Sequence, residues 1–179
     1  STVTPKKRAI SLDVSPDGNT IAFDILGDLY TLPIAGGTAT RITSGPGWDQ
    51  QPRFSPNGKQ LVFVSDRNGS KNVWIANADG TTPRLITRSE RINYASPIWS
   101  ADGQYIITTR VGQLWMYNTS GGSGVQLTGL RAEGAAAPTG AVPSHLAAAL
   151  SGDARYLWVN VSNGVPVTLA SALHADHAT

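Results

Sequence analysis

A turn motif that recurs at regular intervals constrains the fold of this chain more than any other feature of its sequence. The motif is Ser-Pro-Asp-Gly or a close variant, and its serine stands at Ser15, Ser55 and Ser100, with spacings of 40 and 45 residues. Proline presets φ at the second position, Asp or Asn tolerates the bridge and left-handed regions, and glycine supplies a positive φ. Each copy therefore predicts a tight reversal between two strands.

The most complete copy of the repeat runs from Gln51 to Thr87 and predicts one whole sheet unit. Its strands are expected at residues 53–54, 60–65, 72–76 and 84–87. The chain contains 19 Gly and 11 Pro, and only 15% of its residues are charged, which suits many short strands joined by tight turns. Four-stranded units that repeat at this interval are typical of β-propeller blades, so the predicted fold class is all-β.

The copies divide the chain into three clear four-stranded blades and a degraded fourth. In the fourth copy the turn is expected near Ser151, with later strands at 156–161 and 165–169. The predicted segments are an N-terminal segment (1–8), blade 1 (9–48), blade 2 (49–94), blade 3 (95–128), an Ala/Gly/Pro-rich loop (129–144), and the degraded blade 4 with its tail (145–179). No single blade can bury both of its apolar faces, so the blades must stack.

Candidate binding residues gather on one face of the predicted propeller. The loops between the second and third strands, and the loops between blades, emerge on that face, where propeller ligands usually bind. The candidates are Trp48, Asp49, Asp66, Arg67, Arg91, Tyr94 and Arg110. Trp48 with Asp49 forms the better site candidate, although Trp48 could instead pack between blades. Asp66 and Arg67 form either a recognition pair at the channel rim or an ion pair within their own loop.

Catalytic and metal-binding motifs are missing from the sequence. There is no cysteine, no Gly-x-Ser-x-Gly elbow and no helix behind a glycine-rich loop that could cradle a phosphate. His174 and His177 are three residues apart, whereas the zinc-peptidase motif needs a spacing of four with a Glu between them. Four tryptophans, Trp74, Trp99, Trp115 and Trp158, are expected in the core. We therefore predict no catalytic residue, metal or cofactor in this chain.

Charge and hydropathy exclude two classes of partner. Fourteen basic and twelve acidic residues leave a net charge of +2 without a basic stripe, so we expect no nucleic acid partner. No apolar run approaches the roughly 20 residues that a membrane-spanning helix needs, and residues 1–5 lack the pattern of a signal peptide. If the protein is exported, we expect its signal to have been removed.

The repeat resembles the WD40-like propeller repeat of TolB, of tricorn-type peptidases and of the N-terminal region of periplasmic metal-dependent amidohydrolases. The similarity covers about residues 9–128 and is carried by the segments Ser11–Gly18, Gly27–Gly37, Asp49–Gly58 and Ser65–Gly69. It looks strongest to the amidohydrolase group, although the His-x-His motif of that group's catalytic domain does not occur here. The resemblance implies a periplasmic or extracellular location and a ring of six to eight blades, more than this chain contains.

Three hypotheses for function follow. The leading one is a non-catalytic propeller segment that binds a protein or packs against another domain. The second is the propeller portion of an amidohydrolase or peptidase whose catalytic residues lie outside this chain. The third is a small-molecule or sugar site at Trp48, Arg91 and Tyr94. Because an open array leaves apolar faces at its ends, we expect further blades, supplied through a homo-oligomer or by a longer chain.

Overall fold

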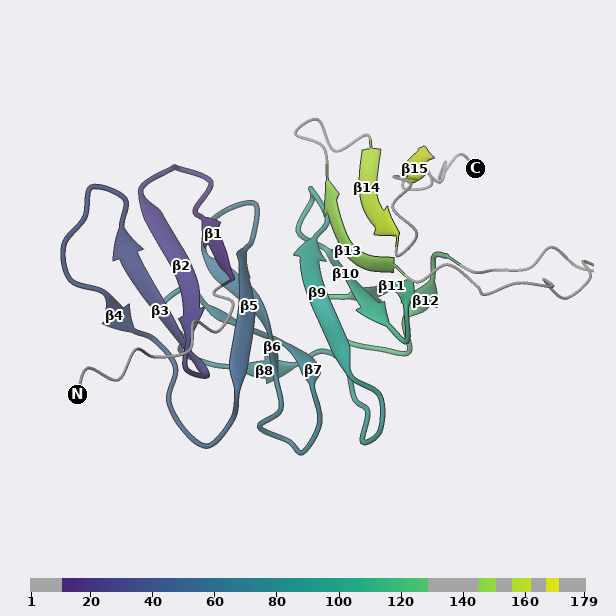
Figure 1. The fold of residues 1–179 in the computed structure, drawn as a ribbon, viewed down its shortest axis with the longest axis horizontal. Helices are drawn as coiled ribbons and strands as arrows, with labels where there is room; N and C mark the ends of the chain where they lie inside the picture. Colours follow the sequence, from purple (N-terminus) through teal and green to yellow (C-terminus); the bar gives the residue numbers. More distant parts are fainter. Residues whose placement is uncertain (1–10, 129–144, 151–155, 162–166, 171–179) are drawn as a thin grey trace, which may run out of the picture.

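A computed structural model describes residues 11–128 and three later strands, at 145–150, 156–161 and 167–170 (Figure 1). The strands form four antiparallel sheets in which neighbours in the sequence are neighbours in space. Blade 1 contains β1 (Leu12–Val14), β2 (Thr20–Ile25), β3 (Asp28–Pro33) and β4 (Thr40–Arg41). Blade 2 contains β5 (Asp49–Phe54), β6 (Gln60–Ser65), β7 (Asn72–Asn77) and β8 (Arg84–Leu85). Blade 3 contains β9 (Tyr94–Trp99), β10 (Tyr105–Arg110), β11 (Gln113–Asn118) and β12 (Val125–Gln126), and the fourth sheet contains β13 (His145–Leu150), β14 (Tyr156–Val161) and β15 (Val167–Ala170).

The structure confirms the predicted all-β class and the three four-stranded blades. In the fourth sheet, β14 has the predicted bounds, whereas β15 begins two residues later than predicted. The first strands of blades 2 and 3 are longer than predicted, because each contains a bulge through which pairing continues to Asp49 and to Tyr94. Tyr94 was expected in the loop that ends blade 2, but it is the first residue of β9.

The turn serine that defines the repeat makes the same two hydrogen bonds in every blade. Its hydroxyl donates to the side-chain oxygen of the turn residue two positions later, at 2.5, 2.8 and 2.5 Å in blades 1, 2 and 3. The same hydroxyl accepts the N–H that opens the second strand, at 2.9 Å in each blade. The donors are Ser15, Ser55 and Ser100, and their acceptors are Asp17, Asn57 and Asp102. The local sequence therefore closes each turn without help from the rest of the fold.

A threonine after the fourth strand repeats in the same way. The hydroxyl of Thr43, Thr87 or Thr128 accepts a backbone N–H from the third strand of its own blade, at 2.9, 2.9 and 3.0 Å. All three threonines are buried. Because a buried hydroxyl without a partner would be costly, this bond ties the short fourth strand to its sheet.

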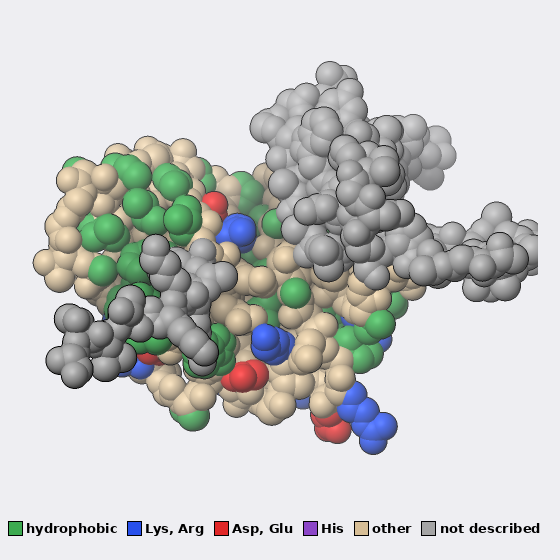
Figure 2. All heavy atoms as spheres, in the orientation of Figure 1, with side chains coloured by type: hydrophobic (Ala, Val, Ile, Leu, Met, Phe, Trp, Pro, Cys, Tyr) green, Lys and Arg blue, Asp and Glu red, His purple; other side chains and the backbone are tan. Residues whose placement is uncertain are grey.

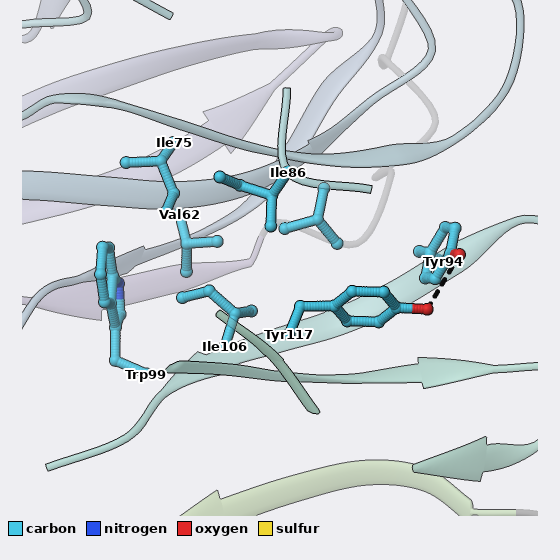
Figure 3. Packing of buried hydrophobic residues seen from close by; sticks show 8 residues of the cluster. Val62, Ile75, Ile86, Tyr94, Trp99, Ile106 and Tyr117 are labelled. Atoms are coloured by element: carbon cyan, nitrogen blue, oxygen red, sulfur yellow. Dashed lines mark hydrogen bonds between the residues drawn. The ribbon is translucent and has the colours of Figure 1, made fainter. Parts of the chain in front are cut away.

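The core lies between the blades and not within any one of them. Figure 3 shows side chains of blade 2, among them Val62, Ile75 and Ile86, meeting Tyr94, Trp99, Ile106 and Tyr117 of blade 3. Two smaller clusters join blades 1 and 2, one of them around Phe54 and Leu61 and the other around Leu29 and Phe63. The predicted core positions of Trp74, Trp99 and Trp115 agree with these clusters, and Trp158 lies in β14.

The first strands of the sheets lie next to one another along the array: β1 beside β5, β5 beside β9, and β9 beside β13. This order aligns the blades in the sequence of the chain, as Figure 1 shows for blades 1 to 3. Over the part of the chain that the structure describes, no helix has the length and apolarity to cross a membrane.

Candidate functional site

The strand register brings the predicted binding residues to one end of the blades. In blade 2, Asp49 is paired with Ser65, and Ser65 with Asn72, so these three residues form a row across the sheet. In blade 3, Tyr94, Arg110 and Gln113 form the corresponding row. Figure 1 shows the loops from β4 to β5, from β6 to β7 and from β8 to β9 together at the lower edge of the view. We call this end the loop face.

A buried ion pair occupies the blade 2 row. One guanidinium nitrogen of Arg67 donates to both carboxylate oxygens of Asp49, at 2.8 and 2.7 Å. The Asp49 side chain is only 2% exposed and that of Arg67 is 22% exposed. The Arg67 Nε donates to the Ser65 hydroxyl at 3.0 Å, and the guanidinium lies over the Trp74 ring, 5.0 Å from its centre. The Arg67 cation is therefore engaged by the protein on several sides.

Trp48 and Asp66 complete this cluster, but Asp66 does not pair with Arg67. The Asp66 carboxylate accepts the Trp48 N–H at 2.7 Å instead, because the chain enters β5 beside it. A Cβ placed on Gly27 would lie 3.0 Å from the Trp48 ring, so the indole covers the β2–β3 turn of blade 1. A Cβ on Gly47 would lie 2.7 Å from that of Arg67. Trp48, Asp49, Asp66 and Arg67 thus lie together in a closely packed junction between blades 1 and 2.

Tyr94 and Arg110 lie in a second cluster, in blade 3. Tyr94 is buried, with 3% exposure, and its hydroxyl lies 3.1 Å from that of Tyr117. Burial, followed by the contact with Tyr117, raises the pKa of Tyr94 well above its ordinary value. Arg110 donates to the Tyr117 hydroxyl at 3.4 Å, and its guanidinium lies 4.2 Å from the centre of the Trp115 ring. Tyr94 is therefore a packing residue, while Arg110 is only half-buried.

Arg91 joins neither cluster and is exposed on the loop before β9. That loop is held by Asn72, a fully buried residue that the sequence analysis did not single out. The Asn72 amide accepts the Ser89 N–H at 3.0 Å, donates to the Ser89 carbonyl at 2.9 Å, and accepts the Thr87 hydroxyl at 3.0 Å. An asparagine at the start of an otherwise apolar strand was the available signal, because a buried amide requires local partners.

A second set of contacts that the sequence analysis missed links the first strands of the blades. Gln51 and Ser96 both adopt left-handed φ values, 58° and 51°, at the bulges of β5 and β9. The Gln51 N–H donates to Asp24 of blade 1 at 2.7 Å, and the Gln51 side chain accepts the Ser96 N–H at 2.7 Å. Burial raises the pKa of the Asp24 carboxyl, although the N–H groups of Gln51 and Ser11 donate to it. Gln51 and Ser96 each stand four residues before the turn serine of their blade, so the bulge occurs at the same position of the repeat in blades 2 and 3.

Among the described residues, no group of three or more His, Cys, Asp or Glu side chains is placed to hold a metal ion. His174 and His177, the pair considered for a metal, lie outside the described residues. The carboxylates Asp17, Asp79 and Asp102 are held by turn hydrogen bonds, which lower the pKa of each.

Known proteins share sequence similarity with this chain. The family model described as the Tricorn protease N-terminal beta propeller domain matches residues 13–159. Tricorn protease homolog 1 of Streptomyces coelicolor is 30% identical over 98 residues, which are 55% of this chain and 9% of that protein. The Tol-Pal system protein TolB of Bordetella pertussis is 38% identical over 56 residues, which are 31% of this chain and 13% of that protein.

A solved structure of TolB from Acinetobacter baumannii superposes with a TM-score of 0.66 and 22% identity, and the match covers 91% of this chain and 44% of that one. This similarity shows the fold. The chain spans less than half the length of each of these three proteins. The shared part is thus propeller, and much of each relative lies beyond it.

Proposed function

Because the chain belongs to the family of the Tricorn protease N-terminal β-propeller domain, we propose that it is a non-catalytic propeller segment that packs against a further blade. One observation carries the proposal: the outer face of blade 1 exposes side chains whose equivalents are buried between the other blades. Figure 2 shows hydrophobic side chains gathered over the part of the molecule where β1 to β3 lie in Figure 1.

The repeat supplies the equivalence. Val14, Phe54 and Trp99 each precede a turn serine; Phe54 and Trp99 are at most 9% exposed, but Val14 is 41% exposed. Six positions after the serine stand Ile21, Leu61 and Ile106, of which the last two are 1% and 0% exposed while Ile21 is half-buried. Blade 1 thus presents to solvent the surface that blades 2 and 3 each bury against the preceding blade.

Neighbouring side chains extend this outer face. Phe23 and Tyr30 stack with their ring centres 5.7 Å apart, and both are half-buried. Leu12 is 57% exposed and Ile25 is 38% exposed. Burying a side chain of this kind contributes about 1.5–3 kcal/mol, and exposed apolar patches of this type mark interaction sites. A further four-stranded blade, from a second copy of the chain or from polypeptide beyond it, fits this face.

The test replaces Val14 by Glu and, as a matched control, Ile34 by Glu. Ile34 is also apolar and 51% exposed, but it follows β3 and lies outside the sheet face. We expect the unmodified chain and Ile34→Glu to bind a hydrophobic dye or to self-associate as concentration rises in sedimentation experiments, and Val14→Glu to lose that property.

The outcomes separate the sources of the second blade. Self-association that only Val14→Glu abolishes identifies a second copy as the partner. A monomer whose dye binding falls only in Val14→Glu identifies polypeptide beyond this chain. A monomer that binds no dye, or two variants that behave alike, would contradict the proposal.

A second candidate function is the propeller portion of a longer enzyme. The observation that favours a peptidase is the similarity to a protein named Tricorn protease homolog 1. The amidohydrolase alternative depends only on the sequence resemblance of segments in blades 1 and 2. If the open reading frame continues into a peptidase domain, the enzyme hypothesis is supported. A stop codon after Thr179 would favour a separate module, for which we propose the periplasmic or extracellular location that the resemblance implies.

A further inference from the structure

Four basic residues lie on adjoining strands and loops where blades 2 and 3 meet on the loop face. The Lys71 carbonyl accepts the Tyr94 N–H at 2.9 Å, and Tyr94 is paired with Arg110, so the three residues form one row across the junction. Arg88 and Arg91 lie in the loop from β8 to β9, which contacts the same row because Asn93 accepts the Lys71 N–H at 3.3 Å. We call Lys71, Arg88, Arg91, Arg110 and the adjoining Val111 the basic loop surface.

The loop that carries Arg88 and Arg91 is held in place by hydrogen bonds from its own chain. Ser89, between the two arginines, is held through both its N–H and its carbonyl by the buried Asn72 amide. The Ser70 hydroxyl also donates to the Ser89 carbonyl. The Ser89 hydroxyl in turn accepts the Ile92 N–H at 2.8 Å. A surface held in this way loses little conformational entropy when a ligand binds.

Among the described residues, no carboxylate forms an ion pair with the cations of this surface. Within the described residues there are two ion pairs, Arg41 with Asp28 and Arg67 with Asp49, and neither involves the basic loop surface. Glu90 is the one acidic residue between Arg88 and Arg91. Arg110 is oriented by the Trp115 ring and the Tyr117 hydroxyl, neither of which cancels its charge.

Val111 adds an exposed apolar side chain to this surface, and its backbone is strained. It forms the turn between β10 and β11 with Gly112, has a φ of 47°, and is 74% exposed. Turns of this kind favour Asn or Gly, because a β-branched residue with positive φ is strained. An aliphatic side chain beside Arg110 suits a ligand that carries both negative charge and an apolar group.

We propose that the basic loop surface binds an acidic peptide segment of a partner protein, with Val111 contacting an apolar side chain of that segment. This site is separate from the outer face of blade 1. A nucleic acid fits less well, because the net charge of the chain is only +2 and the Trp115 ring is covered by Arg110 and stacked against Tyr117.

The test measures fluorescence anisotropy of a labelled peptide built from Glu-Asp-Leu repeats. Arg88→Glu/Arg91→Glu should weaken binding by about tenfold or more, since two attractive charges become repulsive, and binding to the unmodified chain should weaken as salt is raised. The matched control is Lys59→Glu/Arg84→Glu, which changes the net charge equally at two other exposed positions. It should bind the peptide nearly as well as the unmodified chain.

Val111→Asn tests the apolar contact. Asn tolerates positive φ, so the melting temperature should be maintained or raised while the affinity for the peptide falls a few-fold. The proposal is overturned if the peptide does not bind, if both double variants lose affinity equally, or if a labelled oligonucleotide competes as well as the peptide. A fall in melting temperature with unchanged affinity would show that Val111 serves the fold alone.

Discussion

Removing the arginine of the buried ion pair should be among the most destabilising single changes at the loop face. Arg67→Met retains the length of the side chain but leaves the Asp49 carboxylate, which is 2% exposed, without the donor that both its oxygens use. Breaking a buried pair from one side costs about 3–5 kcal/mol. Since Arg67 itself is 22% exposed and water can reach the vacated space, we expect a loss near the lower limit, about 3 kcal/mol.

The assay is unfolding in urea, monitored by far-UV circular dichroism. The Trp74 signal is not used, because the substitution lies beside that ring. The matched control is Arg41→Met, which breaks a pair of similar length, 2.8 Å, whose arginine is 48% exposed. Exposed pairs are worth about 0–1 kcal/mol, so this variant should unfold close to the unmodified chain. Adding Asp49→Asn to Arg67→Met should recover much of the loss, because no buried charge then remains. Equal losses in Arg67→Met and Arg41→Met would refute the reasoning.

Two further changes test close packing and turn chemistry. In Gly80→Ala the new Cβ would lie 1.8 Å from the Ile42 carbonyl oxygen, at a residue whose φ is +84°. The control is Gly58→Ala, which has a similar φ but no contact below 3.5 Å and should lose roughly 1 kcal/mol of stability. Thermal unfolding should show a much larger loss of stability for Gly80→Ala, and equal losses would show that the turn moves freely. The hydrogen bond from the Ser100 hydroxyl lowers the pKa of Asp102 from 3.8 in the folded protein. The stability that this carboxylate adds is therefore present above pH 3.8 and is lost as the pH falls through the lower pKa of the folded state. Asp102→Asn should reduce the loss of stability in acid, and an unchanged dependence of stability on pH would argue against the bond.

The blade interior was predictable because its determinants are local. The turn at Ser55, Pro56, Asn57 and Gly58 needs only residues within five positions of one another, and the same bonds recur in each blade. The second strand of blade 2 has its predicted bounds, Gln60–Ser65, since a tight turn and an apolar run delimit it. The predicted all-β class and the three blades follow from these repeated local signals.

The partners of the charged side chains were not predictable in the same way. Arg67 stands next to Asp66 in the sequence, yet it pairs with Asp49, 18 residues away, because the register of β5 against β6 brings that carboxylate beneath the guanidinium. Tyr94 looked like a loop residue open to a ligand. It is buried because the bulge in β9 extends the strand and turns the ring into the contact between blades.

The repeat, the turns and the number of strands in each clear blade can be inferred from the sequence alone, because these depend on contacts within a few residues or within one sheet. Which side of each blade is covered depends instead on how the blades are assembled in space. The equivalent positions Val14 and Phe54 are both apolar, but one is exposed and the other buried. Stacking acts between blades that are distant in the sequence, so the end of the array appears only when the blades are assembled in space.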